Sequence, residues 1–236
     1  MSDRKLSLDK AEQLAPGSEH YRSYVGPPSR FDFMSLSQLG ILFAFGLRET
    51  DTVLDFGCGS LRAGRMLIPF LREKKYFGIE PNKWLIEDGI DRELGRDATT
   101  LKKPVFSYDD NFDCTVFNKK FDFILAQSIV THAGPNMARK LFESASMSLK
   151  DDGVLLLSYK PGIEQTPLPS DGWSYPQNIL YSPSTMLNML KDYGLSAIEI
   201  PWFHPGAQWL AASLNSQRLP TKDEFKLLAG QPTHRE

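Results

Sequence analysis

The residues most able to bind a ligand are a glycine-rich turn and a glutamate that follows the next predicted strand. The turn, Asp55-Phe56-Gly57-Cys58-Gly59-Ser60, ends a β-branched and aromatic run that is typical of a buried strand. Its two glycines permit a tight bend and let a ligand approach the backbone closely. Glu80 ends the second predicted strand, where a carboxylate can accept hydrogen bonds from ribose hydroxyls. Together these features predict a site for a nucleoside cofactor.

Three details favour S-adenosylmethionine (SAM) over NAD as that cofactor. The NAD fingerprint places a third glycine three residues after the second, but this chain has Arg62 there and its next glycine is Gly64. Asp55 puts a carboxylate where a phosphate would be repelled and a cationic amino group could be held. The two closing strands described next are not part of the usual dinucleotide-binding order.

Strands and helices alternate from residue 52 onward. The patterns predict strands at 52–57, 76–80, 104–108, 121–127, 154–159, 195–200 and 208–214. They predict helices at 34–47, 62–72, 83–94 and 182–193, and one that begins at Pro135 and is closed by residues 151–153. The alternation indicates a mostly parallel sheet covered on both faces. The last two strands have too short a link for a helical crossover, so we expect them to be antiparallel.

The composition of the 236-residue chain suits one α/β domain with a real hydrophobic core. A formal net charge of −2 provides no overall cationic field, so a nucleic-acid partner is not expected. Two cysteines and four scattered histidines predict neither a disulfide framework nor a metal site. The chain shows no signal peptide and no apolar run of about 20 residues, which predicts a cytoplasmic protein with no membrane partner.

The ordered motifs resemble the class I SAM-dependent methyltransferase family over roughly residues 34–214. The matching segments are VLDFGCGSLRAGR, YFGIEPN, FDFILAQSIVTH and LKDDGVLLLSY. The resemblance implies a Rossmann-like three-layer sandwich with a seven-stranded, mostly parallel sheet whose last strand is antiparallel, plus an N-terminal helical cap. The sequence departs from the family at Leu61-Arg62, where many members have another glycine.

The resemblance also implies roles for individual residues. The glycine turn would line the methionine part of SAM, Glu80 would hold the ribose, and Asp109 or Asp110 would contact the adenine. Gln127, at the end of the fourth predicted strand, matches a position that contacts the cofactor in many members. The expected cofactor-binding residues are therefore Asp55, Gly57, Cys58, Gly59, Ser60, Arg62, Glu80, Asp109, Asp110 and Gln127.

His132, just after the fourth predicted strand, is the candidate catalytic residue. The SAM sulfonium is a strong electrophile, so a general base is needed only if the acceptor must lose a proton. The imidazole pKa suits that task. A loop histidine without a chemical role is the equally weighted alternative.

Acceptor recognition is expected from segments outside the core pattern. The candidates are Tyr24 in a loosely structured N-terminal arm, Trp173 and Tyr175 in a long insertion, and His204, for which a packing role among aromatic residues is favoured. Arg62 and Arg65 could reach an anionic acceptor, but surface ion pairs are the favoured reading. The predicted organisation is an arm and helical cap at 1–46, a SAM-binding domain at 47–216 with the insertion at 160–182, and a tail at 217–236.

The sequence thus predicts a SAM-dependent methyltransferase that acts on an oxygen or nitrogen atom of a small molecule. The alternatives are a protein or RNA acceptor, a SAM-binding subunit without turnover, and an NAD-linked dehydrogenase, which the missing third glycine disfavours. The acceptor, the methylated atom and the oligomeric state are not specified by any motif.

Overall fold

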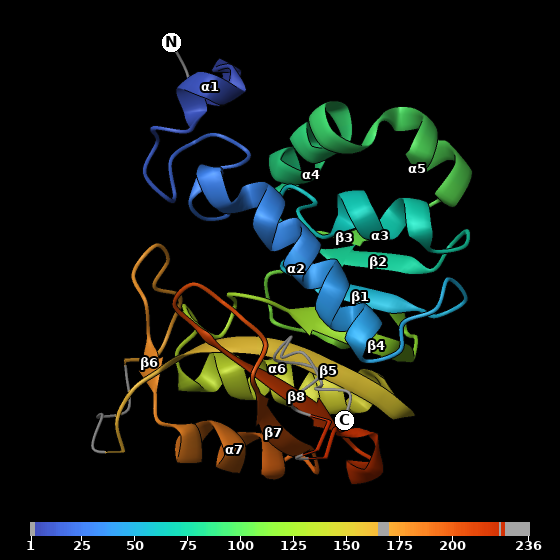
Figure 1. Cartoon of the computed structure of the whole chain (residues 1–236), viewed down its shortest axis with the longest axis vertical. Helices are drawn as coiled ribbons and strands as arrows, with labels where there is room; N and C mark the ends of the chain where they lie inside the picture. Colours follow the sequence, from blue (N-terminus) through green and yellow to red (C-terminus); the bar gives the residue numbers. More distant parts are fainter. Residues whose placement is uncertain (1–2, 165–169, 222, 225–236) are drawn as a thin grey trace, which may run out of the picture. The chain divides into compact units, whose positions relative to one another are not determined.

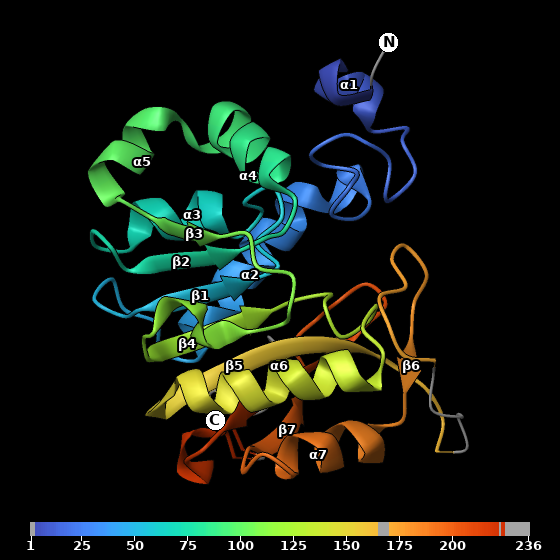
Figure 2. The same cartoon turned by 180° about the vertical axis from the view of Figure 1, so that it is seen from behind.

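The computed structural model describes residues 3–164, 170–221 and 223–224. The chain forms two compact units, Met1–Asp110 and Asn111–Glu236. Figures 1 and 2 draw the helices and strands of both units. Most of the predicted tail at 217–236 lies outside the described residues.

The first unit contains three parallel strands in the order β3-β2-β1. They are β1 (Val53–Phe56), β2 (Tyr76–Ile79) and β3 (Val105–Ser107), and every residue of β1 and β2 is buried. In the register of β1 and β2, Phe56 lies opposite Ile79. The glycine turn and Glu80 therefore leave neighbouring strands at the same end, as the sequence predicts.

Helices surround this half-sheet. Helix α2 (Phe31–Ala44) lies in front of β1 in Figure 1 and behind it in Figure 2, and α4 (Lys83–Gly89) and α5 (Arg96–Lys102) lie beyond β3 in both views. Helix α3 (Gly64–Phe70) contacts α2 and β2. It stops one residue after Pro69, because a proline inside a helix removes a backbone hydrogen bond. The N-terminal arm contributes the short helix α1 (Leu8–Ala11).

Two local predictions in this unit need correction. The predicted helix at 83–94 is interrupted, since α4 ends at Gly89 and a π-helical turn covers Ile90–Leu94. No sequence pattern predicts helix α5. None of its residues is buried, so its sequence carries no apolar stripe from which a helix could be recognised.

The second unit contains strands in the order β4-β5-β8-β7. They are β4 (Phe121–Ala126), β5 (Leu149–Pro161), β7 (Ser196–Ile200) and β8 (Gln208–Ser213). Strand β5 is parallel to β4, whereas β8 is antiparallel to both β5 and β7. A short additional strand, β6 (Leu180–Tyr181), pairs with the end of β5. Helix α6 (Pro135–Ser148) lies in front of β5 in Figure 2 and behind it in Figure 1, next to α7 (Pro183–Lys191).

The predicted end of the helix after Pro135 is wrong. Helix α6 ends at Ser148, and residues 151–153 already belong to β5. Leu149 adopts an extended conformation, so the chain passes directly from helix to strand. Gly153 serves the strand pairing instead, because a Cβ there would lie 2.8 Å from the carbonyl oxygen of Phe121.

The strand series β3-β2-β1 and β4-β5-β8-β7 is the mostly parallel, Rossmann-like seven-strand arrangement with an antiparallel closing strand. The predicted fold class is confirmed, with β6 as an addition. Within the described part of the chain, no helix is long and apolar enough to cross a membrane.

Candidate functional site

The turn after β1 is tightly folded. Gly57 and Gly59 have φ angles of 72° and 52°, in the left-handed region that favours glycine. The backbone N–H groups of Gly57 and Cys58 donate to the carbonyl oxygen of Ile79 at 2.9 and 3.0 Å. Ser60, which follows Gly59, is fully buried, and its hydroxyl has no hydrogen-bond partner among residues 3–164, 170–221 and 223–224.

Glu80 lies against this turn. Its Oε1 atom accepts hydrogen bonds from the backbone N–H and the side-chain amide of Asn82, both at 2.8 Å. Burial raises the pKa of Glu80, and hydrogen bonds from Asn82 and from the backbone of Gly59 oppose that rise. The structure therefore brings together the glycine turn and the carboxylate that the sequence predicts as cofactor ligands.

Asp55 is buried at the end of β1. Its Oδ2 atom accepts a hydrogen bond of 2.8 Å from the hydroxyl of Tyr76. Burial raises the pKa of Asp55 to about 6, although the Tyr76 hydrogen bond and the charge of Arg62 act in the opposite direction. Burial also raises the pKa of Cys58 well above its usual value, so this thiol is not an ionised nucleophile near neutral pH.

Asp55→Asn should stabilise the protein at pH 7.5. Because the pKa of Asp55 is raised from 3.8 to about 6 on folding, ionising it favours the unfolded chain as pH rises through that window. A shift of about two pKa units corresponds to about 3 kcal/mol. At pH 7.5, urea unfolding should show most of this increase in the free energy of unfolding of the variant over the wild type. At pH 3.5, below both pKa values, the difference between the two proteins should vanish. An equal effect at both pH values would contradict the assignment.

The first unit also contains the predicted residues Asp109, Asp110, Arg62 and Tyr24. Asp109 and Asp110 follow β3, and Asp110 is exposed whereas Asp109 is half-buried. Arg62 is engaged by the protein, since its guanidinium donates to the carbonyl oxygen of Val25 at 2.7 Å and to Gln38 at 3.3 Å. Tyr24 packs edge-on against Trp84 and is hydrogen-bonded to Asn82, which brings it to the Glu80 side of this unit.

In the second unit, His132 is held in one tautomer. Its Nδ1 atom lies 2.6 Å from the backbone carbonyl oxygen of Gln177, and a carbonyl can only accept, so Nδ1 carries the proton. Nε2 therefore presents a lone pair, and no described residue forms a hydrogen bond with it. Burial lowers the pKa of His132, partly offset by the Gln177 hydrogen bond, so the imidazole is neutral at pH 7.

The predicted aromatic residues of the insertion surround this histidine. Trp173 and Tyr175 meet the imidazole edge-on, with ring centroids 5.6 and 4.8 Å away. Trp173 is 49% exposed, whereas His132 is buried. The structure thus groups one candidate catalytic residue with two candidate acceptor-binding residues. Residues 165–169 of the insertion lie outside the described part of the chain.

Backbone hydrogen bonds fix the insertion to the segment that carries His132. The absence of a side chain at Gly134 allows the two backbones to approach each other, because a Cβ there would lie 2.5 Å from the Cα atom of Asp171. The bonds run from Gly134 N to Gly172 O, from Ser174 N to His132 O and from Ile179 N to Thr131 O, at 2.7–2.9 Å. Tyr181 adds a 2.7 Å bond from its hydroxyl to the carbonyl oxygen of Ala133.

Gln127 and His204 form a second polar group in this unit. The side-chain amide nitrogen of Gln127 lies 3.2 Å from Nε2 of His204, whose ring also packs against Trp209. The amide oxygen of Gln127 is buried and has no hydrogen-bond partner in the described part of the chain. His204 therefore has the predicted packing role and a polar contact as well.

Sequence reasoning missed several residues that shape these sites. Asn82 lies only two residues after Glu80, so its contact with that carboxylate is a local one of the kind that turn residues form. Tyr76 and the Gln177 carbonyl carry no such signal, since their contacts depend on distant parts of the chain. No cluster of three or more metal-ligating side chains occurs among the described residues.

The family is shown by a model of the methyltransferase domain, which matches residues 29–200. The chain belongs to this methyltransferase family. It is thus a SAM-dependent methyltransferase, with the Rossmann-like fold described above. A search of curated proteins finds no match.

Solved methyltransferase structures share the fold at low sequence identity. Magnesium protoporphyrin IX methyltransferase from Synechocystis PCC 6803 with bound SAM is 14% identical, with a TM-score of 0.60 over 89% of this chain and 91% of that one. The glycopeptide N-methyltransferase MtfA is 14% identical, with a TM-score of 0.59 over 77% and 90% of the two chains. A SAM-dependent methyltransferase from Clostridium acetobutylicum ATCC 824 is 14% identical, with a TM-score of 0.58 over 77% and 91%.

Proposed function

We propose that this methyltransferase transfers the methyl group of SAM to an oxygen or nitrogen atom of a small-molecule acceptor. The observation that carries the proposal is the state of His132, a buried neutral imidazole whose Nε2 lone pair is not engaged by any described residue. Such a group suits an acceptor that must lose a proton, as hydroxyl and N–H groups do. Half-exposed Trp173 beside it offers an apolar surface for a small acceptor.

The residues of the first unit fit SAM. Glu80 would accept hydrogen bonds from the ribose hydroxyls, and the backbone at Gly57 and Gly59 would lie along the methionine part. Asp55 would face the cationic amino group, while Asp109 or Asp110 would contact the adenine. When bound, SAM supplies an electrophilic methyl group on its sulfonium sulfur. Arg62 is bonded to the Val25 carbonyl oxygen and to Gln38, so the protein already engages its guanidinium.

The proton balance of the reaction assigns one step to the protein. Bound SAM would supply the methyl group to the acceptor atom, and its sulfonium sulfur would be the leaving group that keeps the electron pair. The proton of the acceptor passes to Nε2 of His132, which becomes imidazolium and later releases the proton to water. The products are the methylated acceptor and S-adenosylhomocysteine (SAH).

Calorimetric titration with SAM, SAH and NAD tests the cofactor assignment. We expect micromolar binding of SAM and SAH and no binding of NAD. Binding of NAD alone would contradict the proposal.

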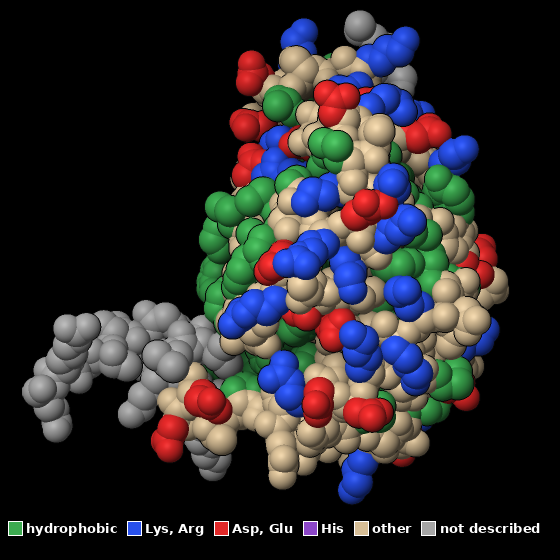
Figure 3. Space-filling view, turned by 90° about the vertical axis from the view of Figure 1, so that its right-hand side faces the viewer, with side chains coloured by type: hydrophobic (Ala, Val, Ile, Leu, Met, Phe, Trp, Pro, Cys, Tyr) green, Lys and Arg blue, Asp and Glu red, His purple; other side chains and the backbone are tan. Residues whose placement is uncertain are grey.

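A screen for SAH formation with small hydroxyl and amine acceptors then tests the acceptor class. Turnover only with a protein or RNA, or tight SAM binding without turnover, would favour the two alternative functions. On the face drawn in Figure 3, Lys and Arg side chains are interspersed with Asp and Glu side chains, so this face is not the uniformly basic surface that nucleic acid favours.

A further inference from the structure

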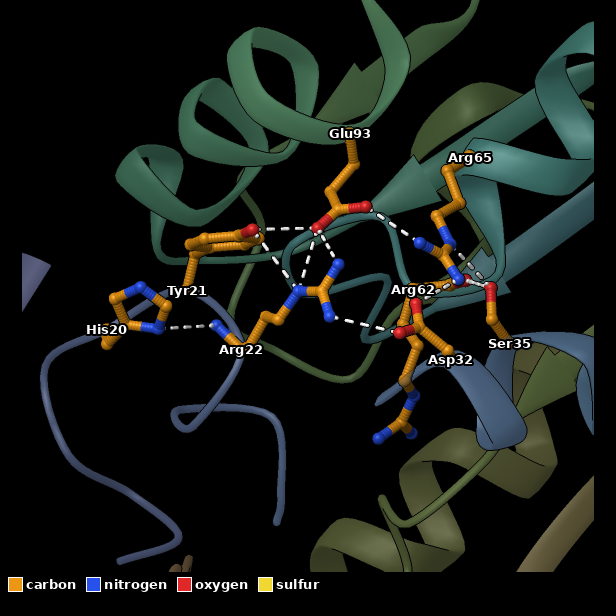
Figure 4. Close-up of polar contacts among 8 residues, drawn as sticks. All are labelled: His20, Tyr21, Arg22, Asp32, Ser35, Arg62, Arg65 and Glu93. Carbon is orange, nitrogen blue, oxygen red and sulfur yellow. Dashed lines mark hydrogen bonds and ion pairs between the residues drawn. The ribbon is translucent and has the colours of Figure 1, made fainter. Parts of the chain in front are cut away.

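The N-terminal arm is firmly attached to the first unit around residues 20–26. His20, Tyr21 and Ser23 are buried, which contradicts the expectation of a loosely structured arm. Figure 4 shows the contacts of His20 with the Arg22 backbone and of Tyr21 with Glu93. The arm is therefore part of the folded structure at the point where it reaches the cofactor-binding elements.

An ion cluster centred on Glu93 makes this attachment. Oε1 of Glu93 lies 2.6 Å from Arg22 of the arm, and Oε2 lies 2.7 Å from Arg65 of α3. The Tyr21 hydroxyl donates to Oε1 at 2.7 Å, and Asp32 of α2 bridges the two arginines at 3.1 and 2.6 Å. The side chains of Arg22, Arg65 and Glu93 are only 14%, 17% and 7% exposed. Such shielded pairs are screened by salt much less than surface pairs.

Beyond this cluster, the arm runs over the glycine turn. Val25 lies so close to Gly59 that a Cβ on Gly59 would be 2.5 Å from Cγ1 of Val25. The Val25 carbonyl accepts the 2.7 Å hydrogen bond from Arg62. Tyr24 is hydrogen-bonded to Asn82, which in turn donates to Glu80. The arm thus contacts both elements that we expect to bind SAM.

We propose that residues 20–26 form a cofactor clamp and that Glu93 is the positioning residue that keeps it closed. This inference rests on the proposed SAM site. Because Val25 already contacts the glycine turn, SAM and SAH would enter and leave this site only when the clamp moves away. Closing it again places Tyr24 next to the ribose carboxylate Glu80. The stability of the ion cluster would then set the rate of cofactor exchange.

The dissociation rate of SAH tests the clamp. Stopped-flow displacement would compare the full-length wild type with Glu93→Gln. Tryptophan fluorescence can follow it, because Trp84 packs edge-on against Tyr24 of the clamp. We expect SAH to dissociate at least tenfold faster from the variant, and to associate faster as well, because entry also requires the open clamp. Asp91→Asn is the matched control, since it removes an exposed ion pair with Arg96 from the same helical turn. It should leave both rates within twofold of the wild type.

A second variant and a second measurement keep the test decisive. If Glu93→Gln fails to fold, Tyr21→Phe removes only the hydroxyl that donates to Glu93 and should accelerate dissociation about threefold. In wild type, SAH should slow hydrogen–deuterium exchange of residues 20–26. If wild type binds SAH, unchanged dissociation in the variants together with unchanged exchange at 20–26 would overturn the clamp. If wild type binds neither SAM nor SAH, the proposed function fails instead, and the clamp with it.

Discussion

Glu80→Ala should weaken SAM binding at least tenfold, and up to about a hundredfold. The variant removes a buried carboxylate that is aligned by two hydrogen bonds from Asn82 and lies against the glycine turn. Hydrogen bonds to a charged group contribute about 1.5–3 kcal/mol, which corresponds to that range of affinity. Calorimetric Kd values for SAM and SAH measured on folded protein would check it.

Glu80→Gln separates the charge of Glu80 from its shape, and Glu87→Gln is a matched control. Glu80→Gln keeps one acceptor oxygen and should bind SAM with an affinity between those of the wild type and Glu80→Ala. Glu87→Gln removes an exposed carboxylate of α4 that pairs with Lys83 at 3.7 Å, and it should bind as the wild type does. Wild-type affinity in Glu80→Ala would show that the ribose is held elsewhere.

His132→Ala should lower kcat by about a hundredfold to ten-thousandfold with the best acceptor found in the screen, the usual range for general-base catalysis. The Kd for SAM should stay within twofold of the wild type, because the variant leaves the first unit unchanged. The loss of the Nε2 lone pair is the physical reason for the slower step.

The pH dependence gives an independent check on the same residue. The base must be neutral, and burial lowers its pKa below the usual 6.5. The value of kcat/KM should therefore be constant above pH 7 and fall only at acidic pH, as the imidazole becomes protonated. His132→Ala should lose this acidic limb, and added imidazole should restore part of its activity. If His132→Ala kept the wild-type kcat and the acidic limb of the kcat/KM profile, His132 would have a packing role only.

The strands and the cofactor half of the candidate site could be predicted because their signals are local. A β-branched run followed by Gly57 and Gly59 identifies β1 and its turn, and parallel pairing of β1 with β2 brings Glu80 to the same end. Residues 151–153 misled the prediction because an acidic pair followed by glycine also suits a helix end. The chain instead uses Gly153 for close contact with β4.

The parts that could not be predicted depend on contacts between distant residues. Arg22 and Glu93 are 71 positions apart, and nothing in either local sequence indicates that they meet. The same is true of Gln127 and His204, which are 77 positions apart. Polar residues in a proline-rich arm are typical of a loose segment, yet a buried ion cluster orders this one.

The backbone hydrogen bonds between 131–134 and 172–179 also matter for how acceptor preference can diverge among descendants of this protein. Main-chain groups hold this segment in place, so its position does not depend on the identity of the side chains at 173 and 175. Substitutions at these two sites can reshape the surface beside His132 while the imidazole keeps its tautomer through the Gln177 carbonyl. Natural substitutions or a small mutant library at these two sites can therefore change the acceptor preference while the backbone of the segment stays in place.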